Sequence, residues 1–179
     1  MADSRTYLCE IVKADAEFLI SIKDVIADRI NGEITDSVDG NKKKKKKKQK
    51  TLFAFRTKRM PGSIGVLIKD NNFAFVSNNH SGQSSHLKRV IIMTYLQKMM
   101  QHVFKKYGFR LIAEGIKETT FSKKILAGEL QVKMQINHDN DKVRFEYEGG
   151  NVRFNVMILE IREILEQKGI RLFQPRLKL

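Results

Sequence analysis

The densest group of charged side chains lies in residues 41–50, which read NKKKKKKKQK. Seven consecutive lysines, and one more at Lys50, could neutralise a row of phosphates by releasing their counterions. Ammonium groups at this density repel one another and bury no apolar surface, so we predict that the loop 33–50 is disordered and solvated. A localisation tag, or an expansion that contacts nothing, would have the same composition, and the sequence leaves these alternatives open.

A polar loop, NNHSGQSSH, is the second place where chemistry could occur, because His80 and His86 flank three serines. A Ser–His hydrolase also needs an orienting carboxylate and an oxyanion hole, and no Asp or Glu lies nearby in the sequence. Two other interpretations need fewer groups. Ser84 or Ser85 could cap the helix that follows, or these serines and His86 could form an anion site at its exposed amides.

Four phenylalanines recur at every second position of two predicted strands, as Phe53 and Phe55 and then as Phe73 and Phe75. Alternation along a strand puts each pair on one face of a sheet. If those faces were exposed beside basic residues, they would form a stacking platform for unpaired bases. The simpler interpretation is the core face of a half-buried sheet, and the ribonucleoprotein motifs of RNA-recognition domains do not match here.

Metal chemistry has little support in this sequence. Asp139-Asn140-Asp141 resembles part of a calcium loop, but it lacks the downstream Gly and Glu, and a hairpin turn favours the same residues. The single cysteine, Cys9, excludes an internal disulfide and a cysteine-built metal site. Its apolar surroundings, YLCEIV, predict a small core residue. We therefore expect neither a metal nor a cofactor.

Composition bounds the class of protein. The chain has 179 residues and a formal net charge of +14, which falls to about +6 (14 − 8) without the eight lysines of residues 42–50. This length supports one substantial core or two small units packed together. No apolar stretch approaches the roughly 18 residues of a membrane span, and the N-terminus lacks the features of a secretion signal. We expect an intracellular protein of a reducing compartment, in the cytoplasm, the nucleus or an organelle.

Apolar periodicity predicts strands that alternate with helices along the chain. Strands are expected at 5–13, 51–57, 63–69, 73–77, 109–117, 130–136, 143–147 and 170–173. Helices are expected from an Asp15 cap to Asn31, over 86–107 before Gly108, and over 155–168 before Gly169. This order indicates an α+β fold, in which two or three helices pack on a mostly antiparallel sheet.

Two units are expected within this order. Residues 1–124 would form an N-terminal α+β unit that contains the disordered loop, and residues 125–179 a small strand-strand-helix unit packed on the first. Each half has strands followed by a helix, but no sequence repeat relates the two halves.

Parts of the chain resemble a known family. GSIGVLIKDNNFAFVSNN has the pattern of a hairpin with an aromatic second arm, and the long helix after it ends in KKYGF. With the opening segment RTYLCEIVKADAEFLISIKDVIADRI, this arrangement resembles the conserved plastid and cyanobacterial reading-frame proteins of the Ycf-thirty-five type. The stretch that begins INHDNDKVRFEYE resembles a small domain often encoded beside them. The lysine run and the lack of tryptophan depart from the family's pattern. The resemblance implies an accessory protein, often of ATPase-containing gene sets, and no established reaction.

We expect a non-enzymatic binding or adaptor module that contacts a polyanion, with nucleic acid or a nucleoprotein assembly as the leading candidate. The alternative is a protein–protein interaction subunit of a larger, ATPase-associated complex in which the basicity is incidental. The basic residues expected to contact the polyanion are Lys42, Lys43, Lys44, Lys45, Lys46, Lys47, Lys48, Lys50, Arg56, Lys58, Arg59, Lys88, Arg89, Lys98, Lys105 and Lys106. The alternative anion site would consist of Ser84, Ser85 and His86.

Overall fold

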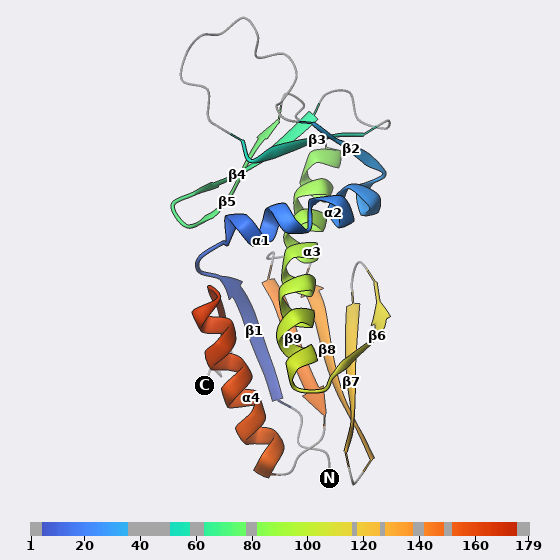
Figure 1. Cartoon of the computed structure of the whole chain (residues 1–179), viewed down its shortest axis with the longest axis vertical. Helices are drawn as coiled ribbons and strands as arrows, with labels where there is room; N and C mark the ends of the chain where they lie inside the picture. Colours follow the sequence, from blue (N-terminus) through green and yellow to red (C-terminus); the bar gives the residue numbers. More distant parts are fainter. Residues whose placement is uncertain are drawn as a thin grey trace, which may run out of the picture. The chain divides into compact units, whose positions relative to one another are not determined.

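The computed structural model describes residues 5–35, 51–57, 63–77, 82–115, 118–125, 128–137, 142–148 and 152–174. Within these residues the fold is α+β and all strand pairs are antiparallel, as predicted (Figure 1). The helices are α1 (Ala16–Ser21), α2 (Lys23–Ile30), α3 (Gly82–Lys106) and α4 (Val152–Gln167). The strands are β1 (Arg5–Ile11), β2 (Gly32–Thr35), β3 (Phe53–Thr57), β4 (Ser63–Lys69), β5 (Asn72–Ser77), β6 (Arg110–Glu114), β7 (Glu118–Ile125), β8 (Gly128–Asn137), β9 (Lys142–Glu148) and β10 (Ile170–Phe173).

The chain forms two compact units. Unit 1 comprises Met1–Lys13 and Leu96–Leu179, and unit 2 comprises Ala14–Tyr95. Helix α3 therefore contributes residues 82–95 to unit 2 and residues 96–106 to unit 1.

This division differs from the predicted boundary between residues 124 and 125. That boundary falls inside β7, which pairs with β8 from Glu118 to Ile125. Strand β1 belongs to unit 1 because its backbone pairs with β9 on one side and with β10 on the other. The pairing of the first strand with strands from the other end of the chain is what local sequence patterns could not predict.

Unit 1 is built on a six-stranded sheet with the strand order β10-β1-β9-β8-β7-β6. Its two faces differ, because Cys9 and its partner Leu172 are buried whereas Glu10, the next residue of β1, is exposed. The second part of α3 and the whole of α4 lie on one face of this sheet (Figure 1). The Phe104 ring of α3 lies 5.0 Å from the Phe121 ring of β7, which fixes the helix against the buried face.

Unit 2 is built on a four-stranded sheet with the strand order β2-β3-β4-β5. The predicted hairpin is confirmed, because β4 pairs with β5 and the two turn residues, Asp70 and Asn71, have φ of 52° and 66°. Two successive left-handed residues match the right-handed twist of the flanking strands. Phe53 and Phe55 of β3 are buried, so the core-face interpretation is confirmed for this pair.

Three local predictions need correction. The helix predicted from Asp15 to Asn31 is two helices, because Ile22 has a non-helical backbone (φ −106°, ψ 8°), although Asp15 does cap the first. The predicted loop 33–50 begins inside β2, which pairs with β3, and its residues 36–50 lie outside the described part of the chain. The predicted strands leave out residues 118–125, which form β7, since the lysines of this segment hide the alternation typical of a strand. None of the described helices is long and apolar enough to cross a membrane.

A single charge in the core of unit 1 should test this packing. Val103 is fully buried on α3, and Val103→Asp places a carboxylate where no water can solvate it. We expect a loss of several kcal/mol in the free energy of unfolding, measured by urea denaturation. Cys9 gives a second readout, because burial raises the pKa of its thiol and protects it from alkylation. Its alkylation should accelerate in the variant, and unchanged stability and reactivity would contradict the packing described.

Candidate polyanion-binding surfaces

The first turns of α3 expose polar and basic side chains in unit 2. Ser84 and Ser85 lie inside the helix rather than at its N-cap, because α3 begins two residues before Ser84. Ser85, His86 and Arg89 are exposed. His80 lies outside the described residues. The anion site therefore stays a prediction, and the capping role is corrected.

The basic residues of unit 2 lie on different faces of its sheet. The Lys88 ammonium lies 5.8 Å from the centre of the Phe75 ring, on the face where α3 packs. Arg56 follows the buried Phe55, so strand alternation places it on the opposite face, where it pairs in register with Glu33. The structure thus separates Arg56 from Lys88. Apart from Arg89, which is exposed on α3, the other predicted basic residues of this unit lie outside the described part of the chain, namely Lys42–Lys48, Lys50, Lys58 and Arg59.

The C-terminal end of α3 carries a basic cluster in unit 1, formed by Lys105, Lys106 and Arg110. All three are exposed, and they follow one another because the chain turns tightly at Gly108, whose φ is 85°. Cations are also favoured here by the partial negative charge at the C-terminus of a helix. The sequence list above lacks Arg110, since only the glycine hinted that the chain turns so soon after the helix. We call these three residues the α3-exit cluster.

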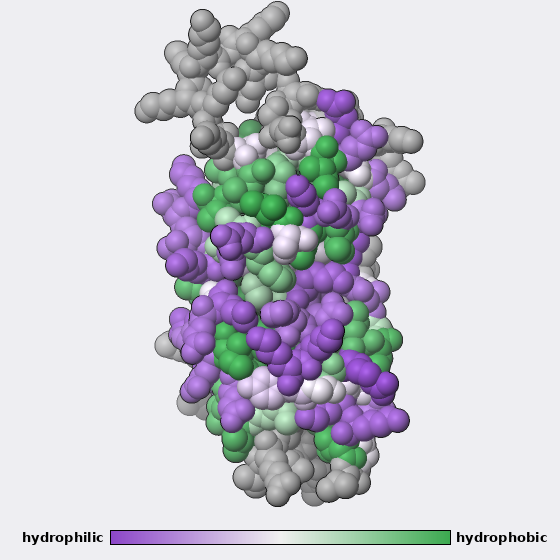
Figure 2. Space-filling view, in the orientation of Figure 1, coloured by the Kyte–Doolittle hydropathy of each residue, from purple (hydrophilic) through white to green (hydrophobic). Residues whose placement is uncertain are grey.

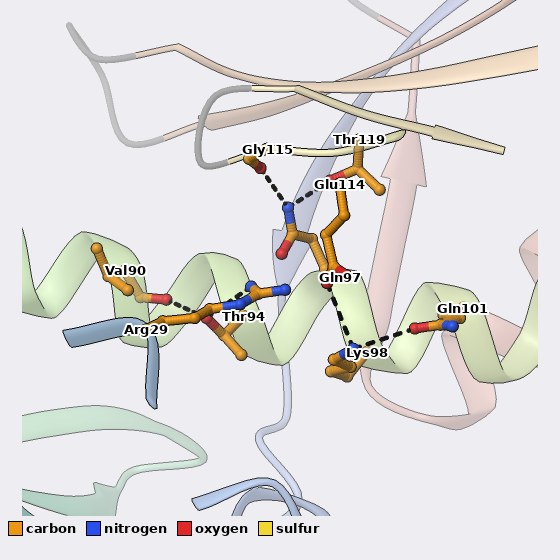
Figure 3. Close-up of polar contacts among 9 residues, drawn as sticks. All are labelled: Arg29, Val90, Thr94, Gln97, Lys98, Gln101, Glu114, Gly115 and Thr119. Carbon is orange, nitrogen blue, oxygen red and sulfur yellow. Dashed lines mark hydrogen bonds and ion pairs between the residues drawn. The ribbon is translucent and has the colours of Figure 1, made fainter. Parts of the chain in front are cut away.

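Two further lysines near this cluster have structural partners. The Lys123 ammonium donates a hydrogen bond to the Tyr107 carbonyl at 2.5 Å, which satisfies an acceptor at the end of α3. Lys98 lies 3.3 Å from a Glu114 carboxylate oxygen, and their side chains are only 24% and 31% exposed (Figure 3). Lys98 was predicted to contact a polyanion, but its charge is already balanced within unit 1.

Buried polar side chains of α3 are satisfied by neighbouring strands and helices (Figure 3). In unit 1, the Gln97 side-chain amide, which is 1% exposed, donates to the Gly115 carbonyl at 2.9 Å and also to the Thr119 hydroxyl. In unit 2, Arg29 donates to the Thr94 hydroxyl at 3.0 Å, and Thr94 donates to a backbone carbonyl one turn earlier. These groups hold elements together, because unsatisfied polar groups in such places would be costly.

Net charge is distributed unequally between the two units. Unit 1 has 18 Lys and Arg against 12 Asp and Glu, a net charge of +6 (18 − 12). Unit 2 has 16 Lys and Arg against 8 Asp and Glu, a net charge of +8 (16 − 8). The eight lysines of residues 42–50 account for all of the net charge of unit 2. Unit 1 has its net positive charge without a comparable run of consecutive lysines.

The sheet face of unit 1 that lacks helices does not hold this excess. Two of its exposed basic residues stand beside acids, because Arg171 pairs in register with Glu10 and Lys124 pairs with Glu129. Neighbouring opposite charges cancel much of the field that a polyanion would feel. The α3-exit cluster is therefore the better candidate surface.

Metal chemistry gains no candidate from the described residues. Within them, no group of three or more His, Cys, Asp or Glu side chains could hold a metal ion. The turn Asp139-Asn140-Asp141 lies outside the described part of the chain, so its assignment to a turn rather than a calcium loop stays a prediction.

No family model matches the chain, and no curated protein matches it. The resemblance to the Ycf-thirty-five type of reading-frame protein therefore stays a prediction, and function has to be argued from the two units themselves.

The different settings of Lys98 and Lys106 give a direct test of which lysines are available. Lys106→Met should reduce the slope of log affinity against log salt for a polynucleotide by about 0.7–0.9, the value for one phosphate contact. Lys98→Met should change that slope little, because Glu114 already neutralises the ammonium. Filter binding or fluorescence anisotropy at several salt concentrations measures both. Equal effects of the two substitutions would contradict the assignment.

Proposed function

We propose that the protein is a non-enzymatic binding module that captures a polyanion, in the first place a nucleic acid, through the α3-exit cluster of unit 1. The observation that carries the proposal is the exposure of Lys105 and Lys106 at the end of α3 and of Arg110 at the start of β6, in a unit with a net charge of +6 (18 − 12). Capture by charge needs no activated nucleophile, and its affinity comes from the release of condensed counterions.

The cluster is preorganised for such contacts. Phe104 and Phe109 lie edge to face with ring centres 5.2 Å apart, and the Phe109 backbone amide donates to the Phe104 carbonyl. Burial and the nearby Glu160 carboxylate of α4 raise the pKa of Tyr107, which lies between the two phenylalanines in the sequence. A fixed backbone reduces the entropy lost when the basic side chains engage phosphates.

Neutralising the cluster should weaken polynucleotide binding in a salt-dependent way. In the variant Lys105→Gln, Lys106→Gln, Arg110→Gln, the slope of log affinity against log salt should fall by about 2 for a single strand, at roughly 0.7 per lost contact. Thermal stability should change little, because all three side chains are exposed.

The matched control removes the same number of charges from the sheet face without helices. Lys124→Gln, Lys133→Gln, Arg171→Gln should reduce the slope much less, because acids stand opposite Lys124 and Arg171. If both triple variants weaken binding equally, binding reflects net charge alone. If neither does, the nucleic-acid proposal fails for unit 1.

A second candidate function, a protein–protein interaction subunit, is favoured by the outer surface of α4. Val156 and Leu159 are 50% and 53% exposed, although the opposite stripe of the helix is buried through Ile158 and Ile161. Exposed glutamates at 160, 163 and 166 continue this outer surface. An acidic and apolar helix surface suits a basic, amphipathic segment of a partner and repels a polyanion.

A peptide titration tests this second candidate. An amphipathic helical peptide of Lys and Leu should bind unit 1 and perturb α4 resonances in NMR spectra, whereas a matched Glu and Leu peptide should not. Val156→Ser with Leu159→Ser should weaken that binding about tenfold, from the apolar area no longer buried. The same pair should leave polynucleotide affinity unchanged. Equal binding of both peptides would contradict the charge argument.

A further inference from the structure

We propose that Phe75 and Lys88 in unit 2 form a contact site for an unpaired nucleobase, so that the nucleic acid bound by this protein is single-stranded. This inference rests on the proposed function, which requires only that a polyanion binds. It adds a second site, chemically different from the α3-exit cluster, and names the form of nucleic acid that it recognises.

The site stands at the end of a row of four aromatic rings, called here the aromatic row, which comprises Phe18, Tyr95, Phe73 and Phe75. Phe18 and Phe73 both meet Tyr95 edge to face, with ring centres 5.4 and 5.0 Å away. Phe73 and Phe75 are nearly parallel, with an interplanar angle of 22° and ring centres 6.4 Å apart. Edge-to-face and offset parallel contacts are the favoured geometries of aromatic pairs.

Exposure changes along the row. Tyr95 is fully buried, and its hydroxyl accepts a hydrogen bond from the Asp15 backbone amide at 2.8 Å. Phe73 and Phe75 are only partly buried, because β5 is the edge strand of its sheet. The row therefore has Tyr95 in the core of unit 2 and partly exposed side chains at Phe18, Phe73 and Phe75. Figure 2 shows hydrophobic surface where Figure 1 places α1 and the β4–β5 hairpin of this unit.

The two phenylalanine pairs of the predicted stacking platform differ in their exposure. Phe53 and Phe55 are at most 3% exposed and cannot meet a base. Phe73 and Phe75 keep part of their surface, and the cation beside them is Lys88 of α3 rather than a residue of the strands. Nothing in the sequence could show that α3 would bring a lysine to this ring.

A ring beside a cation suits a nucleotide rather than a simple apolar ligand. Every base has a π face that can stack on an aromatic ring, and the phosphate attached to it needs a positive charge nearby. Lys88 lies at the ring, and Arg89 and His86 are exposed on the same turns of α3. Base pairs in a duplex already stack on their neighbours, so only an unpaired base can use the Phe75 ring without paying for unstacking.

The experiment compares two single strands that differ only in their bases. The full-length protein is titrated with an unstructured oligodeoxythymidine and with an abasic strand of the same length, which keeps the phosphates. We expect the strand with bases to bind about tenfold more tightly, as stacking of one base allows. Phe75→Leu should abolish this preference and leave affinity for the abasic strand unchanged, because that strand keeps the phosphates.

Two further variants keep the proposal testable if Phe75→Leu does not fold. Phe75→Trp should retain or increase the preference, and Lys88→Met should lower the affinity for both strands, because both carry the phosphates that Lys88 would meet. Lys69→Met is the matched control, because Lys69 is exposed on the same hairpin but alternates with Ile68 and so faces the other side of the sheet. A preference that survives Phe75→Leu, or equal binding of the two strands by the wild-type protein, overturns the inference while the proposed function stands. Failure to bind either strand removes both.

Discussion

The burial of α3 is the constraint on which the rest of the structure depends. Its residues from Val90 to Met100 are buried at almost every position, and unit 1 and unit 2 each draw part of their core from it. A helix that is apolar nearly all round can only exist inside protein. Strands β4 and β5 must therefore cover its first part within unit 2, and strands such as β7 must cover its second part within unit 1.

This constraint also decides where function can lie. Because the middle of α3 has little free surface, its fully exposed basic residues fall on its first turns and at its end. Polar groups that do occur in the middle are already hydrogen-bonded: Gln97 donates to the Gly115 carbonyl, and Thr94 accepts from Arg29 of α2 and donates to the Val90 carbonyl of its own helix. The helix thus presents two separate basic ends, and each belongs to a different unit with its own neighbours.

Sequence patterns predicted the elements whose signals are local. The hairpin around Asp70 and Asn71, the end of α3 at Gly108 and the strand β10 after Gly169 all follow from turn residues and periodicity. Sequence patterns did not predict strands that are very short or whose alternation of apolar and polar residues is interrupted. Strand β2 has only four residues, too few for a clear alternation. Strand β7 contains Lys123, whose hydrogen bond to the Tyr107 carbonyl at the end of α3 is a tertiary contact that local sequence patterns do not reveal.

The candidate sites, too, were only partly predictable from local sequence patterns. Sequence could name basic residues, but it could not tell that Glu114 neutralises Lys98, that Arg56 lies on the far face of its sheet, or that Lys88 meets an aromatic ring. Each of these outcomes depends on residues brought together from distant parts of the chain. A prediction from charge alone therefore counted more available cations than the structure offers, and it did not show that Lys88 lies at an aromatic ring.

The position of β1 between β9 and β10 has a consequence for synthesis on the ribosome. Residues 14–95 form a continuous unit that can close as soon as they have emerged, because all of its strands are then present. The first strand, although made earliest, has to wait until residues 170–173 have emerged before both of its edges are paired. Until then it exposes backbone groups that could pair with another chain, so the interval between the two ends is when nascent unit 1 is most open to misassembly.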